Sequence, residues 1–227
     1  NANYEKVSEK FKAMWKQIAE YFGDYSDYLI FEGMNEPRVV YGTNEWNGGT
    51  AETRSVINKL NQDFIDTVRS TGGKNSTRLL LITTHAAGAS TAAFNGFVVP
   101  DDDYIAMSLH AYNPYFFAFQ VDSQWEYSVW DGSKSGELDT LFSDIDKMFI
   151  SKGIPVVITE FGAQNKNNDD EIVKWLDDYL TRAEKLGIPC VWWDNNVYTA
   201  ANSETFGLFN RKELTWYSDK VADRLTK

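Results

Sequence analysis

The sequence has little cysteine, little histidine and no long apolar segment, and each scarcity excludes a class of protein. Cys190 is the single cysteine among 227 residues, so no disulfide framework can form within the chain. No run reaches the roughly 18 apolar residues that suggest a membrane-spanning helix. The chain contains 2 histidines, and it shows no metal-ligand spacing, phosphate-binding loop or Cys/His cluster. We therefore expect neither a cofactor nor a metal site.

Positive charge is also scarce. The chain has 22 Lys and Arg against 33 Asp and Glu, which gives a formal net charge of −11. This charge argues against nucleic acids and anionic membranes as partners. Hydrophobic residues make up 43% of the chain, enough for a core, and aromatic residues make up 15%, with 8 Trp. Much of the aromatic content is ordinary core, but several Trp fall in loop-like stretches, where flat rings suit sugar stacking.

Apolar residues at helical spacing alternate along the chain with short apolar runs typical of buried strands. The helical patterns end near Gly23, Gly72-Gly73, Gly153 and Gly187, and a last one covers Trp216–Leu225. The strand patterns cover Leu29–Met34, Arg78–Thr84, Tyr104–Leu109, Val156–Thr159 and Val191–Trp193. This alternation predicts right-handed parallel βαβ units. A Gly-Ile-Pro motif occurs twice, in Lys152–Val157 and in Leu186–Val191, 34 residues apart. This spacing is about the length of one βα unit of a (β/α)8 barrel.

The number of strands is too small for a closed barrel, which needs eight. We expect residues 1–227 to supply about strands 4 to 8 of a (β/α)8 TIM barrel in an α/β protein, with the first three βα units outside this chain. The sequence begins at Asn1 rather than at Met and shows no signal peptide, in keeping with that expectation. The missing units could lie on a second chain or have been removed.

Two of the strand patterns end in a carboxylate that is followed by a backbone breaker. Leu29–Pro37 places Glu36 directly before proline, and Val156–Gly162 places Glu160 two residues before glycine. The carboxyl ends of parallel strands form the rim where such sheets keep their ligand sites. Two carboxylates facing each other across that rim have the geometry that hydrolysis of a glycosidic bond requires. Either Glu alone could be a salt-bridged rim residue, but the matching pair favours acid/base chemistry.

Four motifs in order carry a resemblance to a known family. They are Asn35-Glu36-Pro37, His110-Ala-Tyr112, Thr159–Gly162 and Trp192–Asn195. Together they resemble the signatures of glycoside hydrolase family 5, a family of retaining (β/α)8 glycosidases, and Phe31–Arg38 is most similar to its endoglucanases. The resemblance implies a secreted, extracellular enzyme without a cofactor. It would hydrolyse internal β-1,4-glucosidic bonds of cellulose and related β-glucans by double displacement.

The resemblance also implies roles for individual residues. Glu36 would be the general acid/base and Glu160 the nucleophile, with their carboxyl groups about 5 Å apart. Asn35 would bind the 2-hydroxyl of the sugar, Tyr112 would donate a hydrogen bond to Glu160, and His110 would line the cleft beside Glu36. Asn35 could instead be an ordinary asparagine at a strand end, and His110 could be a histidine of the core.

Aromatic side chains and a second histidine complete the predicted substrate site. Trp193 would form the stacking floor for the sugar, whereas Trp192 would point into the barrel wall, because side chains alternate along a strand. His85 ends a strand pattern, so it could equally contact substrate or not. Three further tryptophans in loops are candidates either for sugar platforms or for loop packing: Trp46, Trp125 and Trp130.

Several alternatives remain open at this stage. The polymer could be xyloglucan, β-mannan or mixed-linkage β-glucan, as for a xyloglucanase, β-mannanase or lichenase of the same family. The chain could also be a non-catalytic glucan-binding fragment, or a barrel piece that assembles with a partner chain. The family's Arg and His on earlier strands have no counterpart in this chain. Asn75-Ser-Thr77 fits an N-glycosylation acceptor, which matters in a secreted eukaryotic protein.

Overall fold

The computed structural model describes residues 3–201 and 203–226. The helices are α1 (Tyr4–Tyr21), α2 (Ala51–Ser70), α3 (Thr91–Phe94), α4 (Tyr115–Ala118), α5 (Ser135–Met148), α6 (Asp169–Lys185) and α7 (Asp219–Thr226). The strands are β1 (Phe31–Glu32), β2 (Leu80–Gly88), β3 (Ile105–His110), β4 (Val156–Phe161), β5 (Cys190–Trp192), β6 (Phe209–Asn210) and β7 (Thr215–Trp216). No helix among the described residues combines the length and the apolar character needed to cross a membrane.

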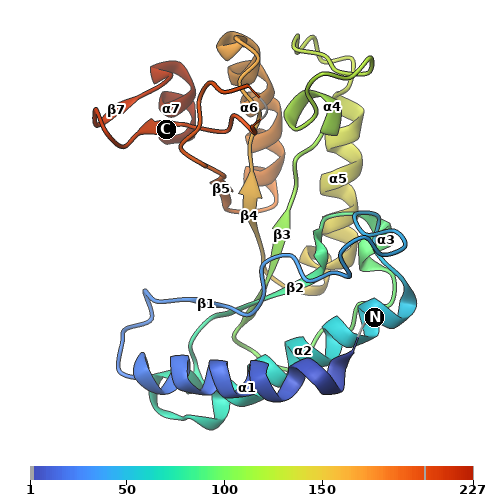
Figure 1. Ribbon diagram of the computed structural model, residues 1–227, viewed down its shortest axis with the longest axis vertical. Helices are drawn as coiled ribbons and strands as arrows, with labels where there is room; N and C mark the ends of the chain where they lie inside the picture. Colours follow the sequence, from blue (N-terminus) through green and yellow to red (C-terminus); the bar gives the residue numbers. More distant parts are fainter. Residues whose placement is uncertain (1–2, 202, 227) are drawn as a thin grey trace. The chain divides into compact units, whose positions relative to one another are not determined.

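The first five strands form one sheet, and each strand lies beside the next one in the sequence (Figure 1). β1 pairs with β2 in parallel, as β4 does with β5, whereas β6 and β7 form a separate antiparallel pair. Helices α2, α5 and α6 come between successive strands of the sheet. This is the strand order of a (β/α)8 barrel, so the predicted partial barrel is confirmed. The chain divides into two compact units, residues 1–109 with 148–156 and residues 110–147 with 157–227.

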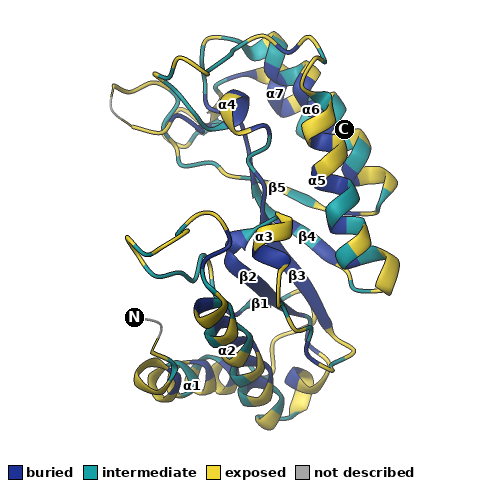
Figure 2. Cartoon of the chain, turned by 90° about the vertical axis from the view of Figure 1, so that its right-hand side faces the viewer, coloured by how far each residue is buried: buried dark blue, intermediate teal, exposed yellow. Residues whose placement is uncertain are grey.

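The first unit is held together by aromatic packing between its helices and β1. Helices α1 and α2 lie side by side (Figure 1), and the ring of Trp15 lies 4.4 Å from that of Phe64. The indole of Trp15 also donates a hydrogen bond to the carbonyl of Gly33, at 3.2 Å. A Cβ at Gly33 would lie 2.8 Å from the Phe64 ring, so only glycine lets β1 approach α2 this closely. Figure 2 shows the buried residues of β2 and β3 next to α2.

A buried arginine joins the end of α1 to the start of β1. Arg78 is 1% exposed, and its guanidinium donates to the side-chain oxygen of Asn75 at 2.7 Å. Further hydrogen bonds of 2.6 to 3.1 Å reach the backbone carbonyls of Phe22, Tyr25, Ser26 and Leu29. Carbonyls withdrawn from water need partners. This one side chain donates to four of them, and those of Phe22 and Ser26 also accept the amides of Tyr25 and Leu29.

Asn75, the acceptor of the possible glycosylation motif, is also fully buried. Its amide nitrogen donates to the carbonyl of Ala19 at 2.8 Å and to the hydroxyl of Thr71 at 2.9 Å. A glycan would replace one of the two hydrogens on that nitrogen, so at least one of these bonds would be lost, and the sugar would have no room in the folded unit. The structure therefore assigns Asn75 to the core rather than to modification of the folded protein.

In the second unit, α6 fixes the ends of β3 and β4. The indole of Trp175 donates to the carbonyl of Asn113 at 3.0 Å, and the hydroxyl of Tyr179 donates to that of Ala111 at 2.9 Å. The ring of Phe161 in β4 stacks on Tyr179 at 5.0 Å. Both α6 side chains are fully buried, so the helix holds the residues after β3 and the end of β4 at defined positions.

The structure corrects several predicted boundaries. β1 is only Phe31–Glu32, shorter than the predicted strand, and β2 continues past His85 to Gly88. Trp216 lies in β7 rather than in the final helix, which begins at Asp219. The reason is a tight turn between β6 and β7, closed by the hydrogen bond from the Leu214 amide to the Asn210 carbonyl. Apolar periodicity cannot distinguish such a short hairpin from the first turn of a helix.

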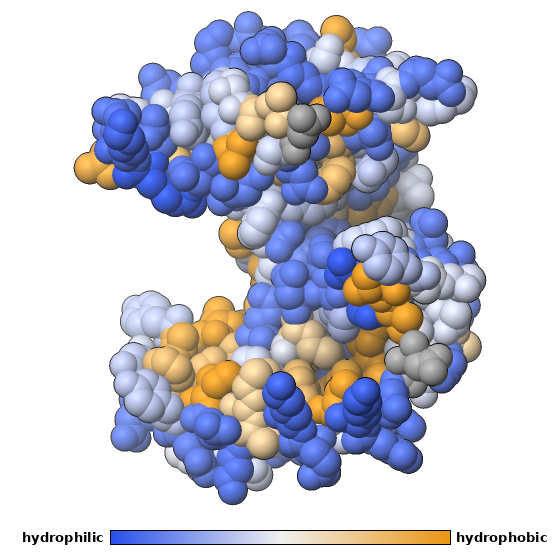
Figure 3. Space-filling model, in the orientation of Figure 1, coloured by the Kyte–Doolittle hydropathy of each residue, from blue (hydrophilic) through white to orange (hydrophobic). Residues whose placement is uncertain are grey.

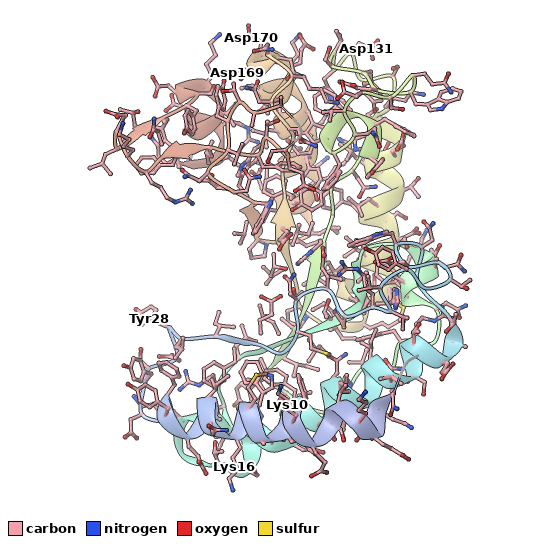
Figure 4. The ribbon with its side chains drawn as sticks, viewed as in Figure 1. Lys10, Lys16, Tyr28, Asp131, Asp169 and Asp170 are labelled. Carbon is pink, nitrogen blue, oxygen red and sulfur yellow. The ribbon has the colours of Figure 1, made fainter. Side chains whose placement is uncertain are left out.

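Apolar side chains reach the surface of the first unit along α1 and around β1, which is the edge strand of the sheet (Figure 3). Val7, Met14 and Ile30 are 44%, 45% and 44% exposed. Tyr28, in the segment that leads into β1, is 96% exposed, and its side chain points away from the chain in Figure 4. An edge strand with apolar neighbours is a surface that other segments of a barrel would cover.

Candidate active site

The second unit brings three of the predicted site residues together at the ends of β3 and β4. Glu160 lies on β4, and the hydroxyl of Tyr112 donates to its Oε2 at 2.9 Å. The Nδ1 of His110 lies 3.2 Å from the same oxygen. The backbone amide of Ala111 donates to the carbonyl of Glu160 at 2.9 Å, which fixes the two strand ends in register. The predicted bond from Tyr112 to Glu160 is thereby confirmed.

The surroundings of Glu160 hold its carboxylate in one orientation. Its side chain is 16% exposed and that of His110 is 4% exposed, so both groups are largely removed from water. A hydroxyl that donates to a carboxylate stabilises the ionised form and restricts the direction in which its oxygens point. The His110 tautomer with hydrogen on Nδ1 would add a second donor to the same oxygen. An ionised, aimed carboxylate at a strand end can act as a nucleophile.

The adjacent tryptophans of β5 and its end point in different directions. The indole of Trp192 donates to the carbonyl of Phe206 at 3.0 Å, and its ring lies 5.7 Å from that of Phe161. It therefore packs inside the unit, as strand alternation predicted. Trp193 is 39% exposed, and its backbone amide is held by the carbonyl of Phe161 at 2.8 Å. This leaves part of the Trp193 ring available to a ligand.

In the first unit, Asn35, Glu36 and Pro37 follow β1 directly. The carbonyl of Pro37 accepts a hydrogen bond from the amide of Ala86 at 3.0 Å, so the motif is tied to the end of β2. Arg38 donates to the carbonyl of Glu36 at 3.0 Å, and the same guanidinium nitrogen lies 3.6 Å from the Glu36 carboxylate. The side chains of both residues are less than a quarter exposed. Asn35 is exposed.

Arg38 also organises the loop that follows. It pairs with Glu45 at 3.0 Å, and its guanidinium lies 4.0 Å from the centre of the Trp46 ring, within the range of cation–π contacts. Trp46 remains 59% exposed. Sequence reasoning did not single out Arg38, although its position directly after Pro37 was the available signal.

His85 is enclosed by this same loop. It is 2% exposed, and its Nε2 lies 2.9 Å from the carbonyl of Glu45. A Cβ at Gly49 would lie 2.4 Å from the imidazole ring. Of the two readings left open for His85, this burial supports packing rather than substrate contact. The ring holds the Glu45–Gly49 segment against the end of β2.

The remaining candidate tryptophans separate by burial. Trp130 is 5% exposed. Its indole donates to Asp178 at 2.9 Å and its backbone amide to Glu171 at 2.7 Å, so it packs against α6. Trp125 is 66% exposed and, like Trp46, presents its ring to solvent. Trp46 and Trp125 therefore remain candidates for sugar platforms, and Trp130 is a packing residue.

The chain matches one family model and is similar to several named endoglucanases. The family model described as cellulase (glycosyl hydrolase family 5) matches residues 1–199. Endoglucanase A of Ruminococcus albus is 49% identical over 227 residues, a match that covers 99% of this chain and 62% of the relative. Endoglucanase A of Clostridium longisporum is 45% identical, with 100% of this chain and 44% of the relative covered.

Solved structures of glycoside hydrolases are also similar to this chain. XEG5A, a xyloglucan-specific endo-β-1,4-glucanase from a metagenomic library solved with cellotriose, has a TM-score of 0.94 at 45% identity, covering 98% of this chain and 65% of that one. A lichenase from Caldicellulosiruptor sp. F32 has a TM-score of 0.91 at 38% identity, covering 98% and 63%. The chain thus spans less than two thirds of each of these relatives. The family match over residues 1–199, together with the sheet of a partial (β/α)8 barrel, shows that the chain belongs to the cellulases of glycosyl hydrolase family 5.

Proposed function

We propose that the protein to which this chain belongs is a retaining endo-β-1,4-glucanase that cleaves internal bonds of cellulose and related β-glucans. The observation that supports this most directly is Glu160, with Tyr112 and His110 directed at one of its carboxylate oxygens. Family membership and the similarity to named endoglucanases support an endo-acting enzyme on β-glucan.

In the proposed reaction, a carboxylate oxygen of Glu160 attacks the anomeric carbon while Glu36 donates its proton to the departing glycosidic oxygen. The carboxylate of Glu36 then takes a proton from water, and this water attacks the same carbon and releases Glu160. Each displacement inverts the anomeric configuration, so the product retains it. The mechanism requires Glu36 protonated while Glu160 is ionised, and carboxyl groups about 5 Å apart.

Asn35 and Trp193 would bind the sugar next to the scissile bond. The exposed Asn35 amide would bond the 2-hydroxyl, a contact that strengthens in the transition state. The exposed part of the Trp193 ring would stack on the sugar face. His110 would hold Glu160 from one side and line the sugar site from the other.

The polymer that the enzyme prefers is decided among several β-glycans. The similar structures include a xyloglucan-specific enzyme and a lichenase, so xyloglucan and mixed-linkage β-glucan belong beside cellulose in the test, with β-mannan as a further alternative. A non-catalytic glucan-binding role is the alternative from another class. Trp46 and Trp125, both exposed, would serve either role.

We also propose that the first three βα units of the barrel cover the β1 edge, whether they belong to the same polypeptide or to a separate chain. Two observations support this: the exposed apolar residues near β1, and the fact that the chain covers between 44% and 65% of the relatives described above. The polymeric substrate would place the enzyme outside the cell.

The test uses the chain alone and the chain together with those first units. Both preparations are assayed on carboxymethyl-cellulose, xyloglucan, lichenan and mannan, and proton NMR records the anomer first released. We expect the β-anomer from the complete barrel, loss of hydrolysis but not of glucan binding in Glu160→Gln, and full activity in the control Glu184→Gln, which changes an exposed residue of α6. Initial release of the α-anomer would refute retention, and binding without hydrolysis by the unmodified protein would favour the glucan-binding role.

A further inference from the structure

We propose that Asp194 and Phe206 are positioning residues for the nucleophile, acting through Tyr112. They hold the Tyr112 ring in the orientation in which its hydroxyl bonds Glu160. The inference deepens the proposed function, because it rests on Glu160 being the nucleophile. All of the residues that carry it lie in the second unit.

The Tyr112 ring is fixed from behind by two phenylalanines. Its centre lies 5.2 Å from that of Phe119 and 5.3 Å from that of Phe206, and the two phenylalanine rings lie 5.5 Å apart. Phe206 is fully buried. A tyrosine hydroxyl lies at the end of a rigid ring, so any tilt of the ring moves the oxygen that bonds Glu160.

Phe206 also lies against the nucleophile's own strand end. A Cβ added at Gly162, two residues after Glu160, would lie 3.1 Å from the Phe206 ring. The carbonyl of Phe206 accepts the hydrogen bond from the Trp192 indole at 3.0 Å. One side chain therefore packs between the nucleophile's strand end and the tyrosine that orients it.

The backbone around Phe206 is held on both sides. On one side, the amide of Thr205 donates to the side-chain oxygen of Gln164 at 2.9 Å. On the other, the amides of Leu208 and Phe209 donate to the two carboxylate oxygens of Asp194, at 3.2 and 3.3 Å.

Asp194 is itself anchored. Its side chain is 16% exposed, its Oδ2 lies 3.2 Å from the Arg211 guanidinium, and its Oδ1 also accepts from the amide of Asn196 at 2.8 Å. It directly follows Trp193 in the sequence. A single carboxylate thus ties the end of β5 to the backbone that carries Phe206, and charge-assisted bonds of this kind are stronger than neutral ones.

The consequence is a continuous set of contacts from Asp194 through Phe206 and Tyr112 to Glu160. Shortening Phe206 leaves space beside the Tyr112 ring, and neutralising Asp194 loosens the backbone that carries Phe206. Misplacement of a reacting group by about 1 Å can cost on the order of 100-fold in rate. We expect a loss of about tenfold for Phe206→Leu and a smaller loss for Asp194→Asn, because each change loosens the ring without removing the hydroxyl.

The test measures the nucleophilic step alone, in the protein with its complete barrel. The reagent is 2,4-dinitrophenyl 2-deoxy-2-fluoro-β-cellobioside: the Glu160 oxygen bonds the anomeric carbon, and dinitrophenolate leaves with the electron pair of the broken bond. This leaving group needs little protonation, so the labelling rate reports on the nucleophile rather than on Glu36. Peptide mass analysis identifies the labelled residue.

We expect Phe206→Leu and Asp194→Asn to slow labelling at saturating reagent while the reagent concentration for half-maximal rate stays unchanged. In a Tyr112→Phe background the same changes should have little further effect, because they act through the missing hydroxyl. Asp177→Asn, which removes an exposed carboxylate paired with Arg224, is the control and should label at the normal rate. Thermal unfolding of each variant verifies folding.

The outcomes are distinguishable. Labelling of Phe206→Leu at the wild-type rate would overturn the inference, and so would an equal slowing with and without the Tyr112 hydroxyl. Failure of the wild type to label, or a label on a carboxylate other than Glu160, would instead refute the proposed function. If Phe206→Leu does not fold, Asp194→Asn carries the same test, because it alters no core side chain.

Discussion

Replacing the buried Arg78 should destabilise the protein far more than replacing an arginine on its surface. In Arg78→Met the side chain keeps much of its aliphatic length and loses all of its hydrogen-bond donors. The four backbone carbonyls at the end of α1 and before β1, together with the side-chain oxygen of Asn75, lose bonds of 2.6 to 3.1 Å. The guanidinium also leaves the Phe31 ring, whose centre lies 4.8 Å away.

The magnitude follows from the carbonyls left behind. The carbonyls of Phe22 and Ser26 still accept the amides of Tyr25 and Leu29, so the acceptors that lose their partner are the carbonyls of Tyr25 and Leu29 and the side-chain oxygen of Asn75. A polar group withdrawn from water without a partner costs about 1 to 3 kcal/mol, so these three at the lower limit give roughly 3 kcal/mol. That is a large part of the total stability of about 5 to 15 kcal/mol expected for a folded protein. Burial lowers the pKa of the Arg78 guanidinium, but arginine stays charged near neutral pH, so the loss should not vary between about pH 6 and 9.

The assay is urea unfolding followed by tryptophan fluorescence, with the loss taken from the midpoint at a common slope. Arg182→Met is the matched control: its guanidinium forms surface ion pairs with Asp139 and Asp178, worth about 0 to 1 kcal/mol. Arg78→Lys keeps the charge but lacks the planar fork, so it should recover less than half of the loss. If Arg78→Met cost no more than Arg182→Met, the carbonyl-pairing argument would be wrong.

Three further predictions concern single side chains. Tyr112→Phe removes the hydroxyl that bonds Glu160 and should lower kcat/KM of the complete barrel by about 10- to 100-fold, the equivalent of one charge-assisted hydrogen bond; an unchanged value would remove Tyr112 from the mechanism. Burial raises the pKa of the Cys190 thiol to about 12, so a disulfide reagent at pH 8 should modify the folded protein at least about 100-fold more slowly than the urea-unfolded one. Hydrogen bonds from Arg69 lower the pKa of Asp102, so this carboxylate stabilises the fold above its unfolded pKa of about 3.9 and stops doing so as the pH falls through its lower folded pKa. Thermal unfolding should therefore show Asp102→Asn less stable than wild type at pH 7, with the difference shrinking in acid; a constant difference would contradict the linkage.

The confirmed predictions of helices and strands depend on patterns among residues that are close together in the sequence. The apolar periods and the Gly and Pro residues that end them placed the helices and the five strands of the sheet, because each pattern is a property of neighbouring residues. Glu36 and Glu160 stood out for the same reason, since each ends an apolar run before a breaker. Boundaries were less accurate at β1 and at Trp216, where two-residue strands leave no period to read.

By itself, the sequence determined the barrel architecture, the family and the candidate carboxylates, because strand order and short motifs are written in consecutive residues. Only the tertiary structure decided which candidates are buried and what supports them. His85 lies under the segment that ends at Gly49, Asn75 bonds the carbonyl of Ala19, and Phe206 packs behind Tyr112. These partners are 36 to 94 residues apart in the chain, and contacts between such distant segments arise only when the elements pack, so no local pattern contains them.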